Sequence, residues 1–519
     1  MKREEMVARI RSKPDAWDLI IIGGGASGLG TAVDATSRGY RTLLLEQHDF
    51  AKGTSSRSTK MVHGGVRYLQ QGNIALVLEA LRERGILQRN APHLVHSLPF
   101  VVPNYDWWEG PFYGAGLKMY DMLAGKLGFG RSRFLTRERT RELIPTVETE
   151  GLRGGIIYYD GQFDDARLAV DLAQTAVTQG GTILNYMRVT ALLKANDMVS
   201  GVQVRDEESG ETYELTGKVV VNATGPFTDS IRMMDDASLK PIISPSQGVH
   251  LVLDKSFLPG DTAIMVPHTS DGRVLFAVPW HNRVVVGTTD TPIDTVLLEP
   301  RPQDEEIGFI LDNVARYLAK HPERKDVLSA YAGVRPLVAP GGSDDTASVS
   351  RDETILVSPS GLVTVAGGKW TTYRKMAEGT VDQAAQIGQL PDRPCATVET
   401  HIHGYHRNAA EFGELSYYGT DAVQIRDLMH QNPSLAERVH PELQCLAAQV
   451  VWAVRSEMAR SVEDFLARRT RALLLDARRS IEAAPRVAEI MARELGRDSA
   501  WQAEQVASYT AQAGGYLVR

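Results

Sequence analysis

The stretch of the chain that most constrains its fold is residues 18–46, DLIIIGGGASGLGTAVDATSRGYRTLLLE. It opens with a short apolar, β-branched run, which is typical of a strand buried on both faces of a parallel sheet. Three glycines then spell G-x-G-x-x-G and predict a tight turn, a backbone open to a pyrophosphate, and a helix packed closely on the strand. These glycines are Gly23, Gly25 and Gly28.

The helix that follows is expected to begin near Ala26, where its N-terminal amides and dipole favour a diphosphate. Residues 42–45 are the expected second strand, and Glu46 ends it, 18 residues after Gly28. A carboxylate at this position would accept hydrogen bonds from a ribose diol. It favours an adenosine with a free 2′-hydroxyl, as in FAD or NAD, over NADP. Because the glycines lie between a strand and a helix and have this acidic end, we predict a dinucleotide site and not a chance turn.

Length and composition limit the class of protein. A chain of 519 residues predicts two to four domains, and a formal net charge of −7 gives no electrostatic case for nucleic acid. The two cysteines form no CxxC, and no metal-ligand spacing is visible, so we expect free thiols and no metal. No run of 18 apolar residues occurs, so no transmembrane helix is predicted, although peripheral membrane contact stays open.

Two further strand–glycine corners follow downstream. Residues 219–222 predict a buried strand that runs into Ala223-Thr224-Gly225, and residues 362–366 predict another that is followed by Gly367-Gly368-Lys369. A helix is expected to start soon after Thr371. Such a helix start could face an anionic or electron-rich ring edge. We therefore expect both corners on the nucleotide side of the sheet.

Other regions predict different structures. Residues 248–289 contain short strands separated by turn residues, which indicates an antiparallel sheet, with His250 on one strand. Residues 331–340, YAGVRPLVAP, are expected to be a loop carrying Arg335. Beyond residue 400 the chain is expected to be mostly helical, including a helix at 462–477. We interpret the arginines at its end as a solvated or interdomain face. These are Arg468, Arg469, Arg471, Arg478 and Arg479.

Two loops have functional interpretations. Residues 47–72 form a long polar, glycine-containing segment at the carboxyl end of a parallel strand, where ligands bind. Residues 105–129 are dense in aromatic residues. Core or interdomain packing is the favoured interpretation of this aromatic stretch. A membrane-surface patch is the alternative, because Trp and Tyr suit the interface.

These motifs together resemble the FAD-dependent glycerol-3-phosphate dehydrogenases of the aerobic, quinone-linked type. The resemblance covers roughly residues 17–519, and the long extra segment that marks the oxygen-using glycerophosphate oxidases is not visible. A dehydrogenase is therefore expected. The matching motifs are IIGGGASGLGTAVDA, GTSSRSTKMVHGGVRYLQ, VVNATGPF, YAGVRPL and AGGKWTTYRKMAE.

The resemblance implies an α/β fold, α+β overall, in three parts. A Rossmann-like FAD-binding domain with a parallel sheet would be discontinuous, over residues 17–90, 160–240 and 350–395. An antiparallel-sheet substrate domain would comprise residues 91–159 and 241–349, and a C-terminal helical cap residues 400–519.

The resemblance also implies a reaction. Glycerol 3-phosphate would lose a hydride to FAD and a hydroxyl proton, giving dihydroxyacetone phosphate, and a membrane quinone would take the electrons. The alternative is an oxidase that passes electrons to oxygen. The implied enzyme is a homodimer in the cytoplasm, peripheral on the inner face of the cytoplasmic membrane.

The resemblance assigns site residues as well. Arg67, Tyr68, Arg335 and Lys369 would bind the substrate, with Arg335 and Lys369 also stabilising charge. His63 and His250 are equally weighted candidates for the general base, and the alternative for each is a purely structural histidine. The residues expected to bind FAD are Gly23, Gly25, Ala26, Ser27, Gly28, Glu46, Thr54, Ser55, Ser56, Thr59, Lys60, His63, Ala223, Thr224, Gly225, Asp229, Gly333, Lys369 and Thr371.

Overall fold

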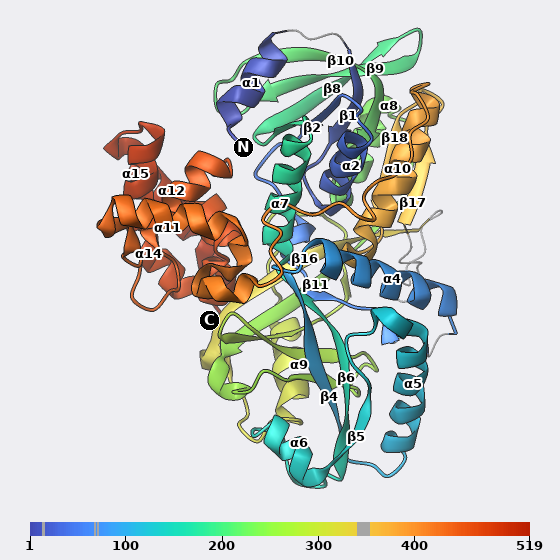
Figure 1. Cartoon of the computed structure of the whole chain (residues 1–519), viewed down its shortest axis with the longest axis vertical. Coiled ribbons are helices and arrows are strands. Elements are labelled where there is room, and N and C mark those ends of the chain that lie inside the picture. Colours follow the sequence, from blue (N-terminus) through green and yellow to red (C-terminus); the bar gives the residue numbers. More distant parts are fainter. Residues whose placement is uncertain (13–15, 67–68, 70–71, 340–352, 519) are drawn as a thin grey trace.

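The structure is a computed structural model that describes residues 1–12, 16–66, 69, 72–339 and 353–518. Figure 1 shows three regions: a sheet flanked by α2, α7 and α10, a second sheet flanked by α5, α6 and α9, and a group of C-terminal helices to one side. This arrangement is the α/β fold with an added helical region that the motifs predict. The expected fold class is confirmed.

The first sheet is parallel at its centre. Its described strands run β17-β18-β10-β1-β2-β7, and the hairpin partners β8 and β9 extend it beyond β10. Only β17 pairs antiparallel within the main path, at the edge. The strands are β1 (Trp17–Ile22), β2 (Thr42–Leu45), β7 (Thr182–Leu184), β8 (Met187–Ala195), β9 (Met198–Asp206), β10 (Thr212–Asn222), β17 (Glu353–Val357) and β18 (Val363–Gly367).

Strand β1 is buried on both faces, as its apolar sequence predicts. Helix α2 (Ala26–Ser37) packs against it, with α7 (Asp165–Thr178) and α10 (Tyr373–Ile387) as neighbours. The close approach depends on Gly28, because a side chain there would place its Cβ 1.9 Å from the carbonyl oxygen of Gly23. Gly28 therefore acts in packing, which is the role of the third glycine in this motif.

The second sheet is almost entirely antiparallel. Its described strands run β15-β11-β14-β13-β12-β4-β6-β3, with β16 added on β11 and β5 on β6. The one parallel pair is β12 with β4. The strands are β3 (Met61–Val62), β4 (Val95–Asn104), β5 (Arg133–Thr136), β6 (Gly154–Phe163), β11 (Ile243–Asp254), β12 (Ala263–Val266), β13 (Leu275–Trp280), β14 (Arg283–Gly287), β15 (Thr291–Pro292) and β16 (Val327–Val338).

The loop predicted at residues 331–340 is wrong for residues 331–338, which form most of strand β16. Residue 340 lies outside the described residues. Strand β16 pairs with β11 in a register that sets Tyr331 beside His250 and Arg335 beside Ser246. Gly333 and Pro336 are turn-forming residues, and they misled the prediction. β16 has a single ladder partner among the described strands, and an edge position tolerates proline.

The aromatic stretch at 105–129 divides between packing and exposure. Helix α5 (Glu109–Ala124) buries Tyr120, while Trp107, Phe112 and Met122 are 76%, 53% and 79% exposed. Figure 1 shows α5 on the outside of the second sheet, with α4 (Ile74–Asn90) nearby. The packing interpretation therefore holds for the buried Tyr120 and fails for the exposed Trp107, Phe112 and Met122.

The remaining helices of the two sheet regions lie at their periphery. Helix α1 (Arg3–Arg11) buries Met6, Val7 and Ile10, and its Arg3 donates to Asp206 at 2.7 Å. The others are α6 (Arg137–Leu143), α8 (Thr228–Asp235) and α9 (Asp304–Ala315). None of the helices in the described ranges has both the length and the apolar composition that a bilayer crossing requires.

The C-terminal region differs from its prediction at one place. The expected helix at 462–477 is instead a π-helical turn, Asp464–Arg469, and a short helix α13 (Ala472–Leu475), separated by Arg471 at φ 60°. Arg468, Arg469 and Arg471 are buried, which agrees with the interdomain interpretation for these three. Arg478 is exposed and Arg479 half-buried, which agrees with a solvated face. The longer helices are α11 (Asp421–Gln431), α12 (Ala447–Ser456), α14 (Ala477–Leu495) and α15 (Ser499–Ala513).

Candidate functional site

The carboxyl ends of four strands meet at one edge of the first sheet. Ile22 is aligned with Leu45 in β2 and with Asn222 in β10, and Asn222 with Thr364 in β18. A cavity of about 1100 Å³ opens at this edge and continues to the second sheet. Pockets for one drug-sized ligand usually measure about 300–1,000 Å³. The cavity is therefore slightly larger than the usual pocket for one drug-sized ligand.

The floor of the cavity is made of backbone that leaves no space for side chains. A side chain at Gly23, where φ is +113°, would place its Cβ 2.6 Å from the carbonyl oxygen of Ala223. At Gly24 the Cβ would lie 2.8 Å from the Cβ of Glu46. Gly25, Ala26 and the rest of the first turn of α2 line the same surface. This floor fits a dinucleotide, because the backbone can approach a diphosphate at a helix N-terminus.

Glu46 marks the far end of this floor. Its two carboxylate oxygens accept hydrogen bonds from the backbone N–H of Gly24 at 2.6 Å and of His48 at 2.8 Å. Burial raises the pKa of Glu46, and these two amides oppose that rise. The carboxylate is thus held at the cavity wall with lone pairs that a ribose diol can use.

In the middle of the cavity, hydrogen bonds join the segment that follows β2 to strand β16 and to residues 370–371. Thr54 Oγ1 donates to the carbonyl of Val334 at 2.6 Å, and the Trp370 ring N–H donates to the carbonyl of Ser55 at 2.9 Å. The backbone N–H of His63 donates to Thr371 Oγ1 at 3.3 Å. Through these bonds one loop joins strand β16 to the third glycine corner.

Arg335 lies at the second-sheet end of the cavity with its orientation fixed. Its Nη1 donates to Asp290 at 3.2 Å and to the carbonyl of Gln247 at 3.3 Å. Its Nη2 donates to Thr288 Oγ1 at 3.1 Å and to the carbonyl of Thr289 at 2.9 Å. A side chain at Gly248 would place its Cβ 2.4 Å from that Nη2, so the position of the guanidinium depends on this glycine.

His250 lies beside Arg335 and is almost fully buried. Its Nε2 is 2.9 Å from Thr59 Oγ1, its ring stacks on Tyr331 at 4.9 Å, and its Nδ1 has no hydrogen-bond partner among the described residues. Burial, with the nearby charges of Arg335 and Lys60, holds the pKa of His250 well below its ordinary value. The imidazole is therefore neutral near pH 7 and can accept a proton.

Most of the residues assigned from the sequence line this one cavity. Arg67 and Tyr68 lie outside the described residues. Four others lie outside the cavity wall: Gly28, Ser56, Lys60 and Asp229. The assigned residues that line it are Gly23, Gly25, Ala26, Ser27, Glu46, Thr54, Ser55, Thr59, His63, Ala223, Thr224, Gly225, His250, Gly333, Arg335, Lys369 and Thr371.

Lys60 is directed away from the cavity, contrary to the expectation that it lines the cofactor. It is fully buried, and its Nζ donates to Asp165 at 2.8 Å and to the carbonyl of Ser56 at 2.7 Å. Burial lowers the pKa of Lys60, and the charge of Asp165 opposes that change. Lys60 is thus part of an internal ion pair behind the cavity wall, and Ser56 belongs to the same buried layer.

Asp229 also makes structural contacts instead of facing the cavity. Its carboxylate accepts hydrogen bonds from the backbone N–H of Ile242 and Ile243, each at 3.0 Å, and from Arg232 at 2.7 Å. These bonds join α8 to the chain that enters β11. The expected position of Asp229 beside the cofactor is therefore not observed.

Several lining residues were missed from the sequence. Arg57 lines the cavity and pairs with Glu299 at 2.7 Å, and Arg273 lines it and donates to the carbonyl of Asp290 at 2.8 Å. Arg57 lies in the polar segment 47–72, which was predicted to be near a ligand, so the sequence indicated its region but not its role. Arg273 and Asp290 belong to no motif, and only the tertiary structure brings them to the site. The described residues contain no cluster of three or more His, Cys, Asp or Glu suited to a metal ion.

Family comparisons match most of the chain. Residues 18–374 match the family described as FAD dependent oxidoreductase. Residues 365–503 match the C-terminal domain of alpha-glycerophosphate oxidase. The two matches together span both sheets and most of the C-terminal helices, and they agree with FAD as the molecule that the glycine floor fits.

Individual relatives agree with this assignment. The chain is 41% identical to the human mitochondrial glycerol-3-phosphate dehydrogenase over 525 residues, covering 94% of this chain and 72% of the human one. It is 42% identical to the Arabidopsis thaliana mitochondrial enzyme over 538 residues, covering 95% and 85%. The solved Bacillus halodurans glycerol-3-phosphate dehydrogenase complexed with FAD is similar at a TM-score of 0.81 and 30% identity, covering 99% and 97%. A glycerophosphate oxidase of Mycoplasma pneumoniae, at 18% identity and a TM-score of 0.56, shares the fold, covering 75% and 98%.

The placement of Lys60 predicts a stability effect. In Lys60→Met the buried carboxylate of Asp165 loses its cation, and breaking such a pair costs about 3–5 kcal/mol of unfolding free energy. Urea denaturation would measure this loss. The double variant Lys60→Met/Asp165→Asn is the control, and it should recover most of the loss because no uncompensated charge remains. If Lys60→Met instead unfolds like the parent but fails to retain its cofactor, Lys60 acts at the cavity after all.

Proposed function

The chain belongs to the FAD-dependent glycerol-3-phosphate dehydrogenases, within the FAD-dependent oxidoreductases, and we propose that it oxidises sn-glycerol 3-phosphate to dihydroxyacetone phosphate. One observation carries this proposal: a fixed arginine, Arg335, lies beside a neutral buried histidine, His250. Both line the same cavity as the glycine floor. An anion-binding group next to a proton acceptor suits a phosphorylated alcohol.

FAD would lie along the glycine floor. Glu46 would bind the adenosine ribose, the first turn of α2 would face the diphosphate, and the corner at Gly368 and Lys369 would adjoin the flavin ring. When bound, the flavin supplies the acceptor for the hydride from the secondary carbon of the alcohol. The protein supplies the binding, the orientation and the proton transfer.

Arg335 is our proposed primary contact for the substrate phosphate. A guanidinium presents forked donors that match a phosphate, and the contacts to Asp290, Thr288 and the neighbouring carbonyls keep it in one orientation. Holding the group before binding reduces the entropy lost when the substrate arrives. Lys369, and by family resemblance Arg67 and Tyr68, would contribute further charge and hydroxyl contacts.

His250 is our proposed general base, with His63 as the second candidate. The hydroxyl proton must leave as the hydride leaves, because a protonated ketone would be a high-energy product. His250 is neutral, lies beside the proposed phosphate site, and has its Nδ1 without a partner in the described part of the chain. The Thr59 hydroxyl at Nε2 would fix the orientation of the ring.

A membrane quinone is our proposed electron acceptor, with oxygen as the alternative. The cavity wall includes Phe112, Tyr113 and Met119 of α5, and the same helix exposes Met122. An apolar helix face rich in aromatic residues suits the interfacial layer of a bilayer. We propose that this face rests on the cytoplasmic surface of the membrane and that the quinone reaches the cavity beneath it.

The phosphate assignment predicts a loss of catalytic efficiency. Arg335→Ala removes charge-assisted hydrogen bonds that are each worth roughly 1.5–3 kcal/mol, so kcat/KM for glycerol 3-phosphate should fall at least about tenfold. Glycerol, which lacks the phosphate, should be a poor substrate of both proteins. Gly248→Ala should act in the same direction by displacing the guanidinium. Gly308→Ala is the matched control, because that position has open space around it. Parent-like kinetics in Arg335→Ala would refute the assignment.

The base assignment predicts a slower flavin reduction. In anaerobic rapid mixing, His250→Asn should bleach the flavin at least about 100-fold more slowly than the parent while retaining FAD. Because the pKa of His250 is held well below 6.5, the parent rate should stay level as pH falls from about 8 to about 6. It should decline only at lower pH, as the imidazole gains its proton. Should His63→Asn lose the rate and His250→Asn keep it, the second candidate is the base.

The membrane assignment predicts a change in vesicle binding. Trp107→Ser/Trp108→Ser should reduce flotation with anionic liposomes, because it removes exposed aromatic surface beside α5. The control is Val423→Ser, which removes an exposed apolar side chain from α11 in the C-terminal region. Initial rates with a quinone analogue and with dissolved oxygen then separate the two acceptors. Equal flotation of both variants and equal quinone rates would leave the aromatic residues without this role.

A further inference from the structure

The loop at residues 46–54 has one face toward the cofactor cavity and one face toward the C-terminal helices. Glu46, His48 and Lys52 line the cavity. Asp49, between His48 and Lys52, is fully buried and does not line the cavity. Whatever holds Asp49 in place therefore also positions the residues that face the cofactor.

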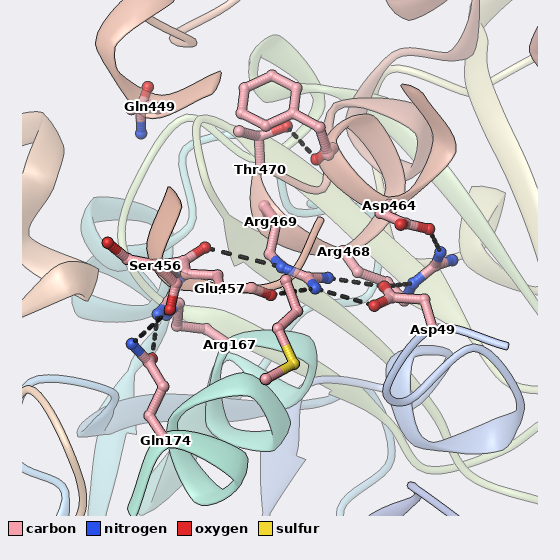
Figure 2. A network of polar contacts seen from close by, with 12 residues as sticks. Asp49, Arg167, Gln174, Gln449, Ser456, Glu457, Asp464, Arg468, Arg469 and Thr470 are labelled. Atoms are coloured by element: carbon pink, nitrogen blue, oxygen red, sulfur yellow. Dashed lines mark hydrogen bonds and ion pairs between the residues drawn. The ribbon is translucent and has the colours of Figure 1, made fainter. Parts of the chain in front are cut away.

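Asp49 is held by two consecutive arginines of the C-terminal region (Figure 2). Its carboxylate accepts hydrogen bonds from Arg468 Nε at 2.5 Å and from Arg469 Nη1 and Nη2 at 2.7 and 2.9 Å. Asn185 adds a weaker donor at 3.3 Å. The two guanidinium groups hold the pKa of Asp49 at about 2, so the carboxylate is ionised near pH 7. All three charged side chains are almost completely buried.

The local backbone explains how two adjacent arginines reach one carboxylate. Neighbouring side chains of a regular α-helix point about 100° apart, since a turn holds 3.6 residues. Residues Asp464–Arg469 instead form a single π-helical turn that ends at Thr470, and the next residue, Arg471, has a left-handed backbone. Such turns occur frequently at functional sites. Here the turn directs Arg468 and Arg469 toward the same loop.

A second contact holds the other end of the loop. Lys52, which lines the cavity, pairs with Glu463 at 2.6 Å, and Glu463 pairs in turn with Arg468 at 2.7 Å. The charged groups of the π-helical segment thus bind the loop at two positions, Asp49 and Lys52. Two attachment points fix the orientation of the intervening residues as well as their distance from the C-terminal region.

The intervening backbone needs such support. Ala51 adopts φ +59°, a conformation that costs a non-glycine residue of the order of 1–3 kcal/mol and persists only where the surroundings impose it. In this conformation its N–H donates to the carbonyl of Gly24 at 2.9 Å, within the glycine floor. The backbone N–H of His48, one residue before Asp49, donates to Glu46. The loop conformation and the position of Glu46 are therefore coupled.

We propose that Arg468 and Arg469 are positioning residues for FAD. Through Asp49 and Glu463 they hold residues 46–54 in the conformation that binds the adenosine half of the cofactor. The C-terminal region contributes no described residue to the cavity wall, yet it sets the affinity for FAD. These arginines act through the loop and contact neither the cofactor nor the substrate.

The competing explanation is that the ion pairs only join two regions of the fold. The same network offers a comparison, because its other branch pairs Arg167 of α7 with Glu457 at 2.7 Å (Figure 2). This pair is as deeply buried as the Asp49 cluster and crosses the same interface. Neither Arg167 nor Glu457 lines the cavity. Breaking each branch in turn separates docking from cofactor positioning.

The experiment compares three variants of the full-length protein stripped of FAD. Arg469→Lys keeps a charge but loses the forked contact to Asp49, and Glu463→Gln weakens the Lys52 contact at a partly exposed position. Arg167→Lys disturbs the comparison branch, and it is preferred to a change at Glu457 because Arg469 itself lies 3.7 Å from the Glu457 carboxylate. Titration with FAD gives its Kd, and thermal unfolding with and without FAD gives the melting temperature of each form.

We expect the FAD Kd to rise at least about tenfold in Arg469→Lys and at least about threefold in Glu463→Gln, with a smaller FAD-induced rise in Tm. Arg167→Lys should lower the Tm of both forms equally and leave the Kd within about twofold. KM for glycerol 3-phosphate at saturating FAD should be unchanged in Arg469→Lys, because Arg335 is untouched. If Arg469→Lys and Glu463→Gln lower Tm but keep the parent Kd, the cluster only joins the two regions. Should Arg469→Lys fail to fold, a parent Kd in Glu463→Gln alone overturns the proposal.

Discussion

The parallel pairing of β1 with β2 on one side and β10 on the other is the constraint on which the site depends. Parallel strands end at the same edge of a sheet, so the register of Ile22 with Leu45 and Asn222 brings their following loops together. The pairing of β10 with β18 adds the third glycine corner at residue 367. Segments separated by more than 300 residues thus form one cavity floor, and the second sheet completes the cavity by placing β11 and β16 over its open end.

The charges at that end act on one another as well as on a ligand. Arg335 is paired with Asp290, and Arg57 with Glu299, so each guanidinium is held in place by a carboxylate. Burial lowers the pKa of His250 most, and the positive charges of Arg335 and the buried Lys60 lower it further. The arrangement that attracts an anion therefore also keeps the neighbouring imidazole neutral. Anion binding and proton acceptance are linked by one set of charges.

The features predicted from the sequence are those that depend on local structure. The first glycine corner could be predicted because its strand, turn and helix lie within 30 residues, and the antiparallel strands alternate with turn residues. Strand β16 was missed because Gly333 and Pro336 favour turns, and only pairing with β11 overrides them. The direction of Lys60 depends on Asp165, 105 residues away, and that of Asp229 on the chain entering β11. No local pattern indicates which of several loop cations finds such a partner.

Buried ion pairs are weak net stabilisers, since the cost of removing both charges from water offsets much of their attraction. The cluster at the C-terminal region is therefore better explained by the geometry it enforces. Arg468 and Arg469 bind Asp49 beside the first sheet. Arg471, two residues on, binds Asp164 at the start of α7 at 3.0 Å. Its Nη2 also lies 3.5 Å from Nε2 of His281, in the β13–β14 turn of the second sheet. Three arginines within four residues thus contact both sheet regions at separate points. A misdocked C-terminal region would leave several buried charges unpaired, and this penalty selects a single arrangement of the three regions around the cavity.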